Sequence, residues 1–230
     1  METPKIIHQT WKNYDLPLNF KKWSETWKEL NPNYEYKLWS DNDNRNFIEE
    51  KYNDFLHHYD SYNHHIKKVD AVRYFYLYEY GGIYCDLDFE CLKNFDILLN
   101  NHKDYDVILG YMGEDKTFEH CIPNALMISK PKSDFWLHVI NKMISRVNSG
   151  TPEFDTGPIL LKNSIDDYHN KNIIKILEPK YFYSIDWNTE FGKSMRRKFV
   201  NDNIKDNKKN KKKNIYFKNS YAITYWTHSW

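Results

Sequence analysis

Cysteine is scarce in this chain, and long apolar runs are missing. The 230 residues contain three cysteines, Cys85, Cys91 and Cys121, which form no Cys-x-x-Cys pair and whose odd number gives no complete disulfide framework. No stretch approaches the ~20 apolar residues of a membrane span, and the mean hydropathy is −0.85. The first residues do not resemble a charged and apolar leader. We therefore expect a soluble protein without a transmembrane segment, in a reducing compartment such as the cytoplasm.

Net charge is also small, at +1 with an isoelectric point near 7.7, so nothing in the whole chain predicts a nucleic-acid partner. One segment departs from this balance. Residues 193–213 hold ten Lys or Arg side chains against Asp202 and Asp206, a local charge of +8. We expect a solvated and flexible insertion there. The alternative is a basic flap that covers a diphosphate or an acidic acceptor, or that makes peripheral contact with an anionic membrane surface.

Aromatic residues are abundant, at 17% of the chain with 19 Tyr and 8 Trp. Sugars and bases stack on aromatic faces, so part of this excess is expected to face a ligand; the alternative is a core and surface rich in tyrosine. The chain length allows one sizeable domain with its own buried core and is short for two. We therefore expect a single domain over residues 1–230.

The first half of the chain alternates between strand and helix patterns. Residues 5–9 read as a short strand, and apolar side chains at helical spacing follow over residues 20–30 until Pro32. Residues 34–39 alternate as a second strand would, and residues 41–44 offer a helix cap. A strand followed by a helix is the unit from which layered α/β domains are built.

A second unit follows. Residues 65–80 carry apolar side chains at the spacing of an amphipathic helix, which Gly81 and Gly82 can close in a left-handed conformation, and residues 83–85 read as a strand. Strand patterns at residues 107–109 and 125–128 and a helical pattern over residues 135–144 continue the alternation. We predict an α/β fold with a mainly parallel sheet, in which ligands bind beyond the carboxyl ends of the strands.

The strongest chemical signal is the sequence Gly-Gly-Ile-Tyr-Cys-Asp-Leu-Asp at residues 81–88. Residues two apart face the same side of a strand, so Asp86 and Asp88 converge if strand geometry persists that far. Converging carboxylates at a sheet edge favour a cation, and hard oxygen ligands favour Mn²⁺ or Mg²⁺, which keep positions open for phosphate oxygens. We predict that Asp86 and Asp88 bind a divalent metal.

The preceding helix brings two further polar residues towards this site. Arg73 lies thirteen residues before Asp86, and Asp70 lies three residues earlier on the same helix face. Arg73 is expected to contact a phosphate or a sugar hydroxyl while Asp70 orients it and accepts sugar hydroxyls. The alternative is a plain ion pair on the helix surface.

Taken together, these motifs resemble the pattern of glycosyltransferase family 32, which includes yeast mannosyltransferases and inositolphosphoceramide mannosyltransferases and is distantly similar to the clostridial glucosylating toxins. The resemblance runs in order over nearly the whole chain. It rests on residues 4–11 (Pro-Lys-Ile-Ile-His-Gln-Thr-Trp), 70–74, 77–78, 81–88, 156–158 (Thr-Gly-Pro) and the terminal Ser229-Trp230.

The resemblance implies a GT-A fold, a nucleotide sugar donor such as GDP-mannose or a UDP-hexose, a divalent metal, a glycan or glycolipid acceptor and retention of anomeric configuration. It assigns the nucleotide base to Trp11, which a first strand otherwise buries in a core. Asp70 and Arg73 would bind the donor sugar, and Tyr84 would line the donor pocket. Asp86 would face the ribose or the metal, with Asp88 as the firmest metal ligand.

The end of the chain departs from the family pattern, because Thr224 and Tyr225 occupy the stretch where relatives commonly carry a histidine. His228 would then serve as the third metal ligand, or Asp88 and phosphate alone would hold the metal. Ser229 is expected to donate a hydrogen bond to a phosphate oxygen, and the Trp230 indole N–H to the oxygen that leaves with the diphosphate.

Asp155, directly before the Thr-Gly-Pro motif, is the carboxylate expected nearest the reacting face of the sugar; otherwise it is a helix N-cap. The histidine pairs at residues 57–58 and 64–65 have no partner carboxylate at convincing spacing and are expected at solvated helix ends.

Two other functions stay open. Aspartate-nucleophile phosphatases also carry Asp-x-Asp after an apolar strand, but they want Thr or Val two residues after the second Asp, where this chain has Glu90. A non-catalytic nucleotide-sugar binder would keep the pocket without turnover. The interpretation we favour is a metal-dependent retaining hexosyltransferase.

Overall fold

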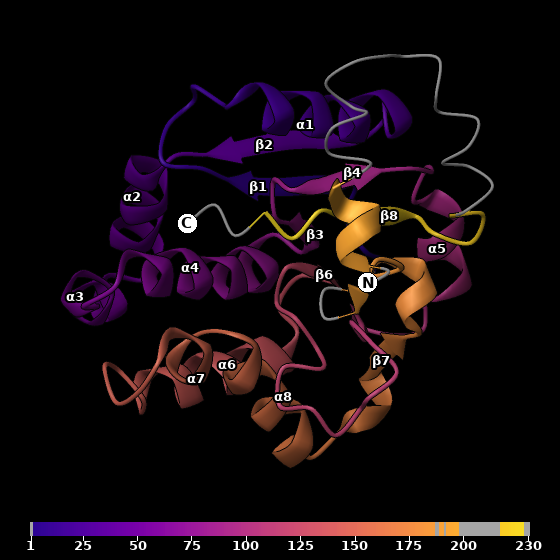
Figure 1. Cartoon of the computed structure of the whole chain (residues 1–230). Helices are drawn as coiled ribbons and strands as arrows, with labels where there is room; N and C mark the ends of the chain where they lie inside the picture. The colour runs from indigo at the N-terminus through magenta and orange to yellow at the C-terminus, as the bar shows by residue number, and fades with distance from the viewer. Residues whose placement is uncertain (1, 187–188, 191, 198–216, 228–230) are drawn as a thin grey trace.

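A six-stranded sheet forms the centre of the computed structural model, which describes residues 2–186, 189–190, 192–197 and 217–227 (Figure 1). Its strand order is β2-β1-β3-β6-β5-β7, and only β6 runs antiparallel to its neighbours. The predicted α/β fold with a mainly parallel sheet is therefore confirmed. The strands are β1 (Ile6–Thr10), β2 (Glu35–Trp39), β3 (Gly82–Cys85), β5 (Val107–Gly110), β6 (Leu126–Ser129) and β7 (Ile174–Leu177).

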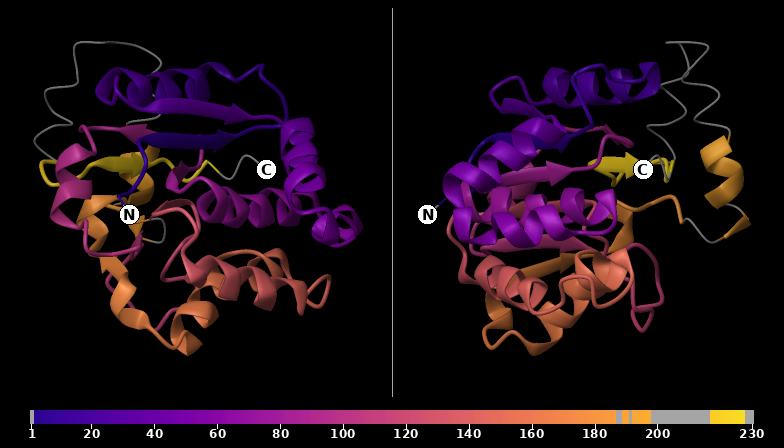
Figure 2. Two further views of the ribbon diagram at one scale, coloured as in Figure 1. Left: turned by 180° about the vertical axis from the view of Figure 1, so that it is seen from behind. Right: turned by 90° about the vertical axis from the view of Figure 1, so that its left-hand side faces the viewer.

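Helices pack on the strands and on one another. Helix α4 packs against α6, and α6 against α8. The two views of Figure 2 place α1 near the edge strand β2, and α8 towards the opposite edge of the sheet. The helices are α1 (Leu18–Leu30), α2 (Asp41–Lys51), α3 (Asn53–Ser61), α4 (His65–Glu79), α5 (Asp96–Asn101), α6 (Asp134–Ile144), α7 (Pro152–Asp155) and α8 (Pro158–Asp167), with 3₁₀ turns η1 (Lys171–Ile173) and η2 (Pro179–Tyr181).

Helix α4 is the central helix of the molecule. The sequence pattern predicts an amphipathic helix with one solvated face, but every side chain from Asp70 to Leu77 is buried. The sheet lies on one side of α4, and α6 and α7 pack against it elsewhere. Polar groups on α4 therefore have to be paired inside the protein, which bears directly on Asp70 and Arg73.

Gly81 and Gly82 close α4 and start β3. Their φ angles are +65° and +87°, the left-handed region that glycine adopts without strain. A Cβ atom on Gly82 would lie 2.5 Å from the carbonyl oxygen of Ile6 in the neighbouring strand β1. The predicted left-handed closure is confirmed. Strand β3 starts directly after this turn and ends at Cys85, the residue before Asp86.

We expect Gly82→Ala to destabilise the protein by roughly 2–3 kcal/mol, because alanine adds both positive-φ strain and a clash with β1. Urea unfolding of the purified protein measures this cost. Gly113→Ala is the matched control, since an added Cβ there meets no described heavy atom within 4 Å. Equal stability of the two variants would contradict the constraint at Gly82.

A two-stranded ribbon lies beside the main sheet, and the sequence did not predict it. Strand β4 (Phe89–Cys91) pairs antiparallel with β8 (Ala222–Thr224), far away in the chain. The helix α1 packs against this ribbon, where the Trp27 indole donates a 2.9 Å hydrogen bond to the carbonyl of Phe89. The ribbon places the residues after β8 beside Asp88, where the Tyr225 amide donates to the Asp88 carbonyl. Most of the basic segment predicted as an insertion, residues 198–213, lies outside the described residues.

Candidate active site

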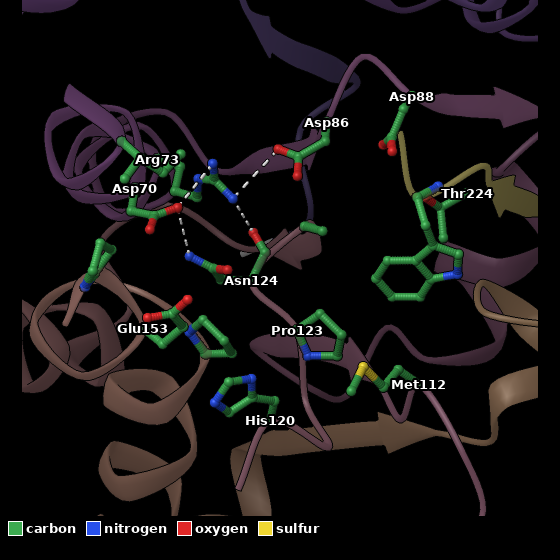
Figure 3. Close-up of a pocket in the computed structure, with 15 residues that line it drawn as sticks. Asp70, Arg73, Asp86, Asp88, Met112, His120, Pro123, Asn124, Glu153 and Thr224 are labelled. Carbon is green, nitrogen blue, oxygen red and sulfur yellow. Dashed lines mark hydrogen bonds and ion pairs between the residues drawn. The ribbon is translucent and has the colours of Figure 1, made fainter. Parts of the chain in front are cut away.

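A cavity of about 370 Å³ opens beyond the carboxyl end of β3 (Figure 3). Its walls come from α4, the turn after β3, the segment before β6, helix α7 and the end of β8. Three of its carboxylates were predicted as site residues. The lining residues are Ile66, Asp70, Arg73, Asp86, Asp88, Met112, His120, Pro123, Asn124, Ala125, Pro152, Glu153, Pro158, Thr224 and Trp226.

Asp86 and Asp88 both line this cavity, but strand geometry does not bring them together. Strand β3 ends at Cys85, and Asp86 to Asp88 form a turn before β4, in which the Phe89 amide donates to the Asp86 carbonyl at 3.2 Å. The Asp86 amide is held by the carbonyl of Ala125 at 2.8 Å. The condition for convergence by strand alternation, that strand geometry persists to Asp88, is therefore not met, and a turn places the two carboxylates instead.

Asp70, Arg73 and Asp86 form one buried network. The Arg73 guanidinium lies 3.0 Å from Asp70 Oδ1 and 3.4 Å from Asp86 Oδ1, and it donates to the carbonyl of Asn124 at 2.8 Å (Figure 3). The Asn124 side chain donates to Asp70 at 3.1 Å. Arg73 is only 1% exposed. This excludes the alternative of a surface ion pair and places both residues in the cavity wall.

Burial sets the protonation of these carboxyls. It raises the pKa of Asp70 to about 6, with Arg73 opposing the shift and Asp86 adding to it. Burial also raises the pKa of Asp86, while Arg73 and the Tyr84 hydroxyl oppose it. The pKa of Asp88 rises to about 7, first through burial and then through the nearby Asp86 charge. Several carboxyls with raised pKa values in one cavity are typical of a functional site.

Asp88 lacks the cationic partner that its neighbour has. The Thr227 amide donates to its Oδ2 at 2.9 Å, and the Thr224 hydroxyl also lowers its pKa, but none of the described Lys, Arg or His side chains forms an ion pair with it. Asp88 is 6% exposed and Asp86 7%. Asp70, Asp86 and Asp88 are three buried carboxylates, and Arg73 is paired with only the first two. A divalent cation at Asp86 and Asp88 would offset the charge that Arg73 leaves uncompensated.

The protein's own metal ligands are few. Within the described ranges, no group of three or more His, Cys, Asp or Glu side chains is arranged to hold a metal ion. Asp86 and Asp88 are the two candidate ligands, and His228, the predicted third, lies outside the described residues, as do Ser229 and Trp230. A cation held by two carboxylates needs further oxygen ligands from a substrate or from water.

A second cavity of about 230 Å³ adjoins the first and shares Ile66, Arg73, Asp86 and Asp88 with it. Trp11 lines this second cavity and packs edge-to-face on Phe20 at 5.0 Å between ring centroids. The indole N–H of Trp11 is buried without a hydrogen-bond partner among the described residues. Trp11 is thus placed in a cavity wall rather than in the closed core that a first strand often buries.

Tyr84 is a residue of β3 whose side chain contacts Arg73. Its ring is fully buried beneath the guanidinium, whose central carbon is 4.5 Å from the ring centroid, and its hydroxyl donates to Asp86 Oδ1 at 2.8 Å. It lines the second cavity. Tyr84 therefore orients both Arg73 and Asp86 from below.

Asp155 differs from its prediction. Its carboxylate is fully buried, accepts a 2.7 Å bond from the equally buried Lys67 ammonium and a 3.0 Å bond from the Ser149 hydroxyl, and lines neither cavity of the site. It is the last residue of α7, and Gly157 is the N-cap of α8, so the N-cap alternative is also wrong. Asp155 holds α7 against α4 instead of facing an acceptor.

The sequence reasoning missed several residues that the fold brings to the site. Asn124 supports Asp70 and Arg73, Thr224 and Thr227 hold Asp88, and Glu153 and His120 line the far wall of the first cavity. Asn124 directly precedes the predicted strand at 125–128, which was its only signal. The sequence around Thr224 or Glu153 contains no local signal that these segments return to the cavity. Of the histidines at 57–58 and 64–65, His65 lines the second cavity and lies 3.2 Å from the Asp41 carboxylate, and the other three line neither cavity.

In the part of the chain that the structure describes, no helix has both the length and the apolar character needed to cross a membrane.

Comparison with known proteins finds similar glycosyltransferases. Residues 17–109 match the family described as "Glycosyltransferase sugar-binding region containing DXD motif". "Inositol phosphoceramide mannosyltransferase 2" of Schizosaccharomyces pombe is 33% identical over 193 residues, which cover 78% of this chain and 50% of that protein. "Uncharacterized glycosyltransferase L373" of Acanthamoeba polyphaga mimivirus is 28% identical over 190 residues, with coverage of 78% and 72%. The chain thus spans about half the length of the yeast relative.

Among solved structures, "PaToxG Glycosyltransferase" superposes with a TM-score of 0.52 at 16% identity, covering 74% of this chain and 72% of that chain. At this identity the likeness concerns the fold, and it agrees with a GT-A arrangement of the sheet. The matched region contains α4, the Gly-Gly turn and the turn that carries Asp86 and Asp88. The match to the family with the DXD motif therefore covers the helix, the glycine turn and both carboxylates of the candidate site.

Proposed function

We propose that this protein is a metal-dependent, retaining glycosyltransferase that moves a hexose from a nucleotide diphosphate sugar to a hydroxyl of a glycan or glycolipid. One observation carries the proposal. Asp86, Asp88 and Arg73 stand at the boundary of two adjoining cavities, one lined by Trp11 and the other by Asp70. Such a boundary suits a diphosphate, with an aromatic face for a base on one side and a hydrogen-bonding carboxylate for a sugar on the other.

The donor would thus lie across both cavities. Trp11 would stack on the base in the smaller cavity, and Asp70, whose orientation is fixed by Asn124 and Arg73, would accept hydrogen bonds from sugar hydroxyls. Asp86 and Asp88 would hold Mn²⁺ or Mg²⁺, which when bound offsets the negative charge of the departing nucleoside diphosphate. Arg73 lines both cavities and so faces the junction of sugar and diphosphate.

The transfer needs no protein nucleophile in this arrangement. The bond from the anomeric carbon to the diphosphate oxygen breaks, and the acceptor oxygen bonds to the same face of that carbon. The acceptor proton passes to a phosphate oxygen of the leaving nucleoside diphosphate. The burial of Asp155 in its pair with Lys67 supports this route, because it removes the predicted carboxylate from the reacting face. Water-poor cavity walls would limit hydrolysis of the donor.

The identity of the donor sugar is proposed from the names of similar proteins. Relatives of this chain carry the names of inositol phosphoceramide mannosyltransferases, which makes GDP-mannose the first donor to test. UDP-glucose, UDP-galactose and UDP-N-acetylglucosamine are the alternatives, since the same two carboxylates would hold their diphosphates. A glycolipid acceptor is proposed on the same ground.

A panel of these four donors with and without Mn²⁺ tests the function. We expect one donor to raise the melting temperature by about 5–10 °C at a hundredfold excess over Kd, because binding to the folded state stabilises by about 2.7 kcal/mol there. EDTA should abolish the shift. The same donor should be hydrolysed slowly with Mn²⁺, measured by release of the nucleoside diphosphate.

Each other outcome has a meaning. A donor that binds with Mn²⁺ but is neither hydrolysed nor transferred would favour a non-catalytic nucleotide-sugar binder. Full activity in EDTA would overturn the metal dependence. Absence of any shift or hydrolysis with all four donors would contradict the proposed function as a whole.

A further inference from the structure

The first cavity extends beyond what the donor uses. Asp70, Arg73, Asp86 and Asp88 line one wall, and Figure 3 shows Glu153, His120, Pro123 and Met112 on the opposite side. The volume of about 370 Å³ lies within the range of ligand-binding sites. The smaller cavity, which Trp11 lines, is an additional space next to it. The opposite side therefore has room for a second small molecule next to the donor sugar.

Two side chains of this opposite wall carry unused hydrogen-bonding capacity. None of the described residues forms a hydrogen bond or an ion pair with the side chain of Glu153 or His120, although both line the cavity. The His120 ring lies tilted against the Phe118 ring, at 5.1 Å between centroids. A carboxylate accepts hydrogen bonds, and a neutral imidazole both donates and accepts, so the pair can bind neighbouring hydroxyl groups.

Glu153 is presented from a fixed position. Helix α7 is only four residues long, but Asp155, two residues after Glu153, is fully buried in its pair with Lys67. The Thr151 side chain caps the same turn by accepting from the Phe154 amide. Residues two apart on a helix point to nearly opposite sides, so anchoring Asp155 inward directs Glu153 outward into the cavity.

The opposite wall also contains apolar residues. Met112, Pro123 and Pro158 line it without charged groups, and such surfaces pack on the C–H faces of a ring. Asp70 and Asp86 are paired with Arg73, and Asp88 is assigned to the metal by the proposed function, so Glu153 is the carboxylate left for a second ligand. A phosphate group on that ligand would be repelled by the carboxylates of this cavity, which favours an uncharged ring.

We infer that Glu153 and His120 form the acceptor subsite and that the acceptor presents a neutral polyol ring, a sugar or a cyclitol. This inference rests on the proposed function, which supplies the donor. Glu153 accepts hydrogen bonds from hydroxyls next to the attacking one and sets the ring on the apolar wall. It is a specificity residue that touches the acceptor and takes no part in binding the donor.

The first experiment does not require a donor. Saturation-transfer NMR on the full chain measures binding of methyl α-mannoside, methyl β-glucoside and myo-inositol, with glucosamine and mannose 6-phosphate as charged probes. We expect at least one neutral polyol to bind, a tenfold or larger rise of its Kd in Glu153→Gln, and an intermediate value in Glu153→Asp. Glu29→Gln, on α1 and outside both cavities, should keep polyol binding.

The second experiment uses the donor identified by hydrolysis. Glu153→Gln should raise the acceptor KM at least tenfold while the donor KM stays within threefold, and Glu29→Gln on α1, which lines neither cavity of the site, is the matched control. The same polyol on a ceramide in phosphatidylcholine vesicles, compared with the free ring, separates a lipid from a soluble source.

Several results would overturn the assignment. Failure of all three neutral polyols to bind the wild-type protein would do so. A Kd for glucosamine or mannose 6-phosphate more than tenfold lower than the Kd of the neutral polyols would also do so. A Glu153→Gln variant with polyol Kd within twofold of wild type would remove Glu153 from the subsite. Polyol binding without any donor hydrolysis would instead leave the subsite standing and count against the proposed function.

Discussion

The Asp88→Asn variant, stripped of divalent cations, is expected to melt at a higher temperature than wild type and yet lose transfer at least ~10³-fold, or roughly 4 kcal/mol of transition-state stabilisation. Asp88 is a buried carboxyl without a cationic partner among the described residues. Asparagine keeps an oxygen that accepts from the Thr227 amide but removes the charge. Stability gained by losing function is expected where a site is built for a ligand that offsets its charge.

The raised pKa of Asp88 predicts how the stability difference between Asp88→Asn and wild type depends on pH. The pKa of Asp88 is about 7 in the folded protein against 3.8 as its ordinary value. A raised carboxyl pKa favours folding while the group is protonated, and this contribution is lost as pH rises through about 7. Ionised Asp88 therefore costs the folded state roughly 4 kcal/mol above pH 7, reduced by any relaxation of the site. The melting temperature difference between Asp88→Asn and wild type should be largest above pH 7 and shrink towards pH 4.

Differential scanning calorimetry in EDTA and a transfer assay in Mn²⁺ measure the two halves of this prediction. Asp104→Asn, at an exposed turn position, is the control that removes one carboxylate without touching the cavity. A variant that melts below wild type at pH 8 would mean that Asp88 is already compensated within the protein. Transfer activity within tenfold of wild type would remove Asp88 from the metal site.

Local sequence rules account for much of the fold up to residue 85. The spacing of apolar residues predicts α1 and α4, and the glycine pair predicts the left-handed turn that the φ angles of Gly81 and Gly82 confirm. These features depend on a few neighbouring residues, so a single sequence contains the information. The same rules predicted β5 and β6 but not that β6 runs antiparallel, because direction depends on where the chain crosses the sheet.

The site itself was predictable only in part. Asp70, Arg73, Asp86 and Asp88 come from one continuous stretch of helix, turn and strand, and the structure gathers them at one cavity. The residues that complete that cavity return from far along the chain, Asn124 before β6, Glu153 on α7 and Thr224 at the end of β8. Such contacts arise from tertiary packing, which leaves no periodic signal in the sequence.

Asp155 illustrates the opposite failure, and its partner gives the second large prediction. Lys67 and Asp155 are both 0% exposed, and the Lys67 ammonium also donates to the carbonyl of Gly150 at 3.0 Å. A sequence shows a carboxylate beside a Thr-Gly-Pro motif but not a lysine 88 residues away that neutralises it. The carboxylate that seemed free for chemistry is therefore a structural one.

We expect Lys67→Met to lower the free energy of unfolding by about 3–5 kcal/mol, because it leaves the Asp155 charge buried without its cation. The double variant Lys67→Met, Asp155→Asn should recover at least about 2 kcal/mol of that loss, since the asparagine can still accept from the Ser149 hydroxyl while carrying no charge. Urea unfolding at pH 7.5 measures all three proteins. The exposed pair of Lys162 and Asp166 on α8 supplies the control, and Lys162→Met should cost less than about 1 kcal/mol.

The same pair couples stability to the site. Lys67 lies on α4 about one turn before Asp70, and Asp155 is the last residue of the helix that contains Glu153. The ion pair therefore connects the donor wall of the cavity to the opposite wall. Loss of the pair should therefore also weaken polyol binding in Lys67→Met at temperatures where the protein remains folded. A Lys67→Met protein within 1 kcal/mol of wild type would show that α7 is held by its packing alone, and that the position of Glu153 does not depend on the buried charge pair.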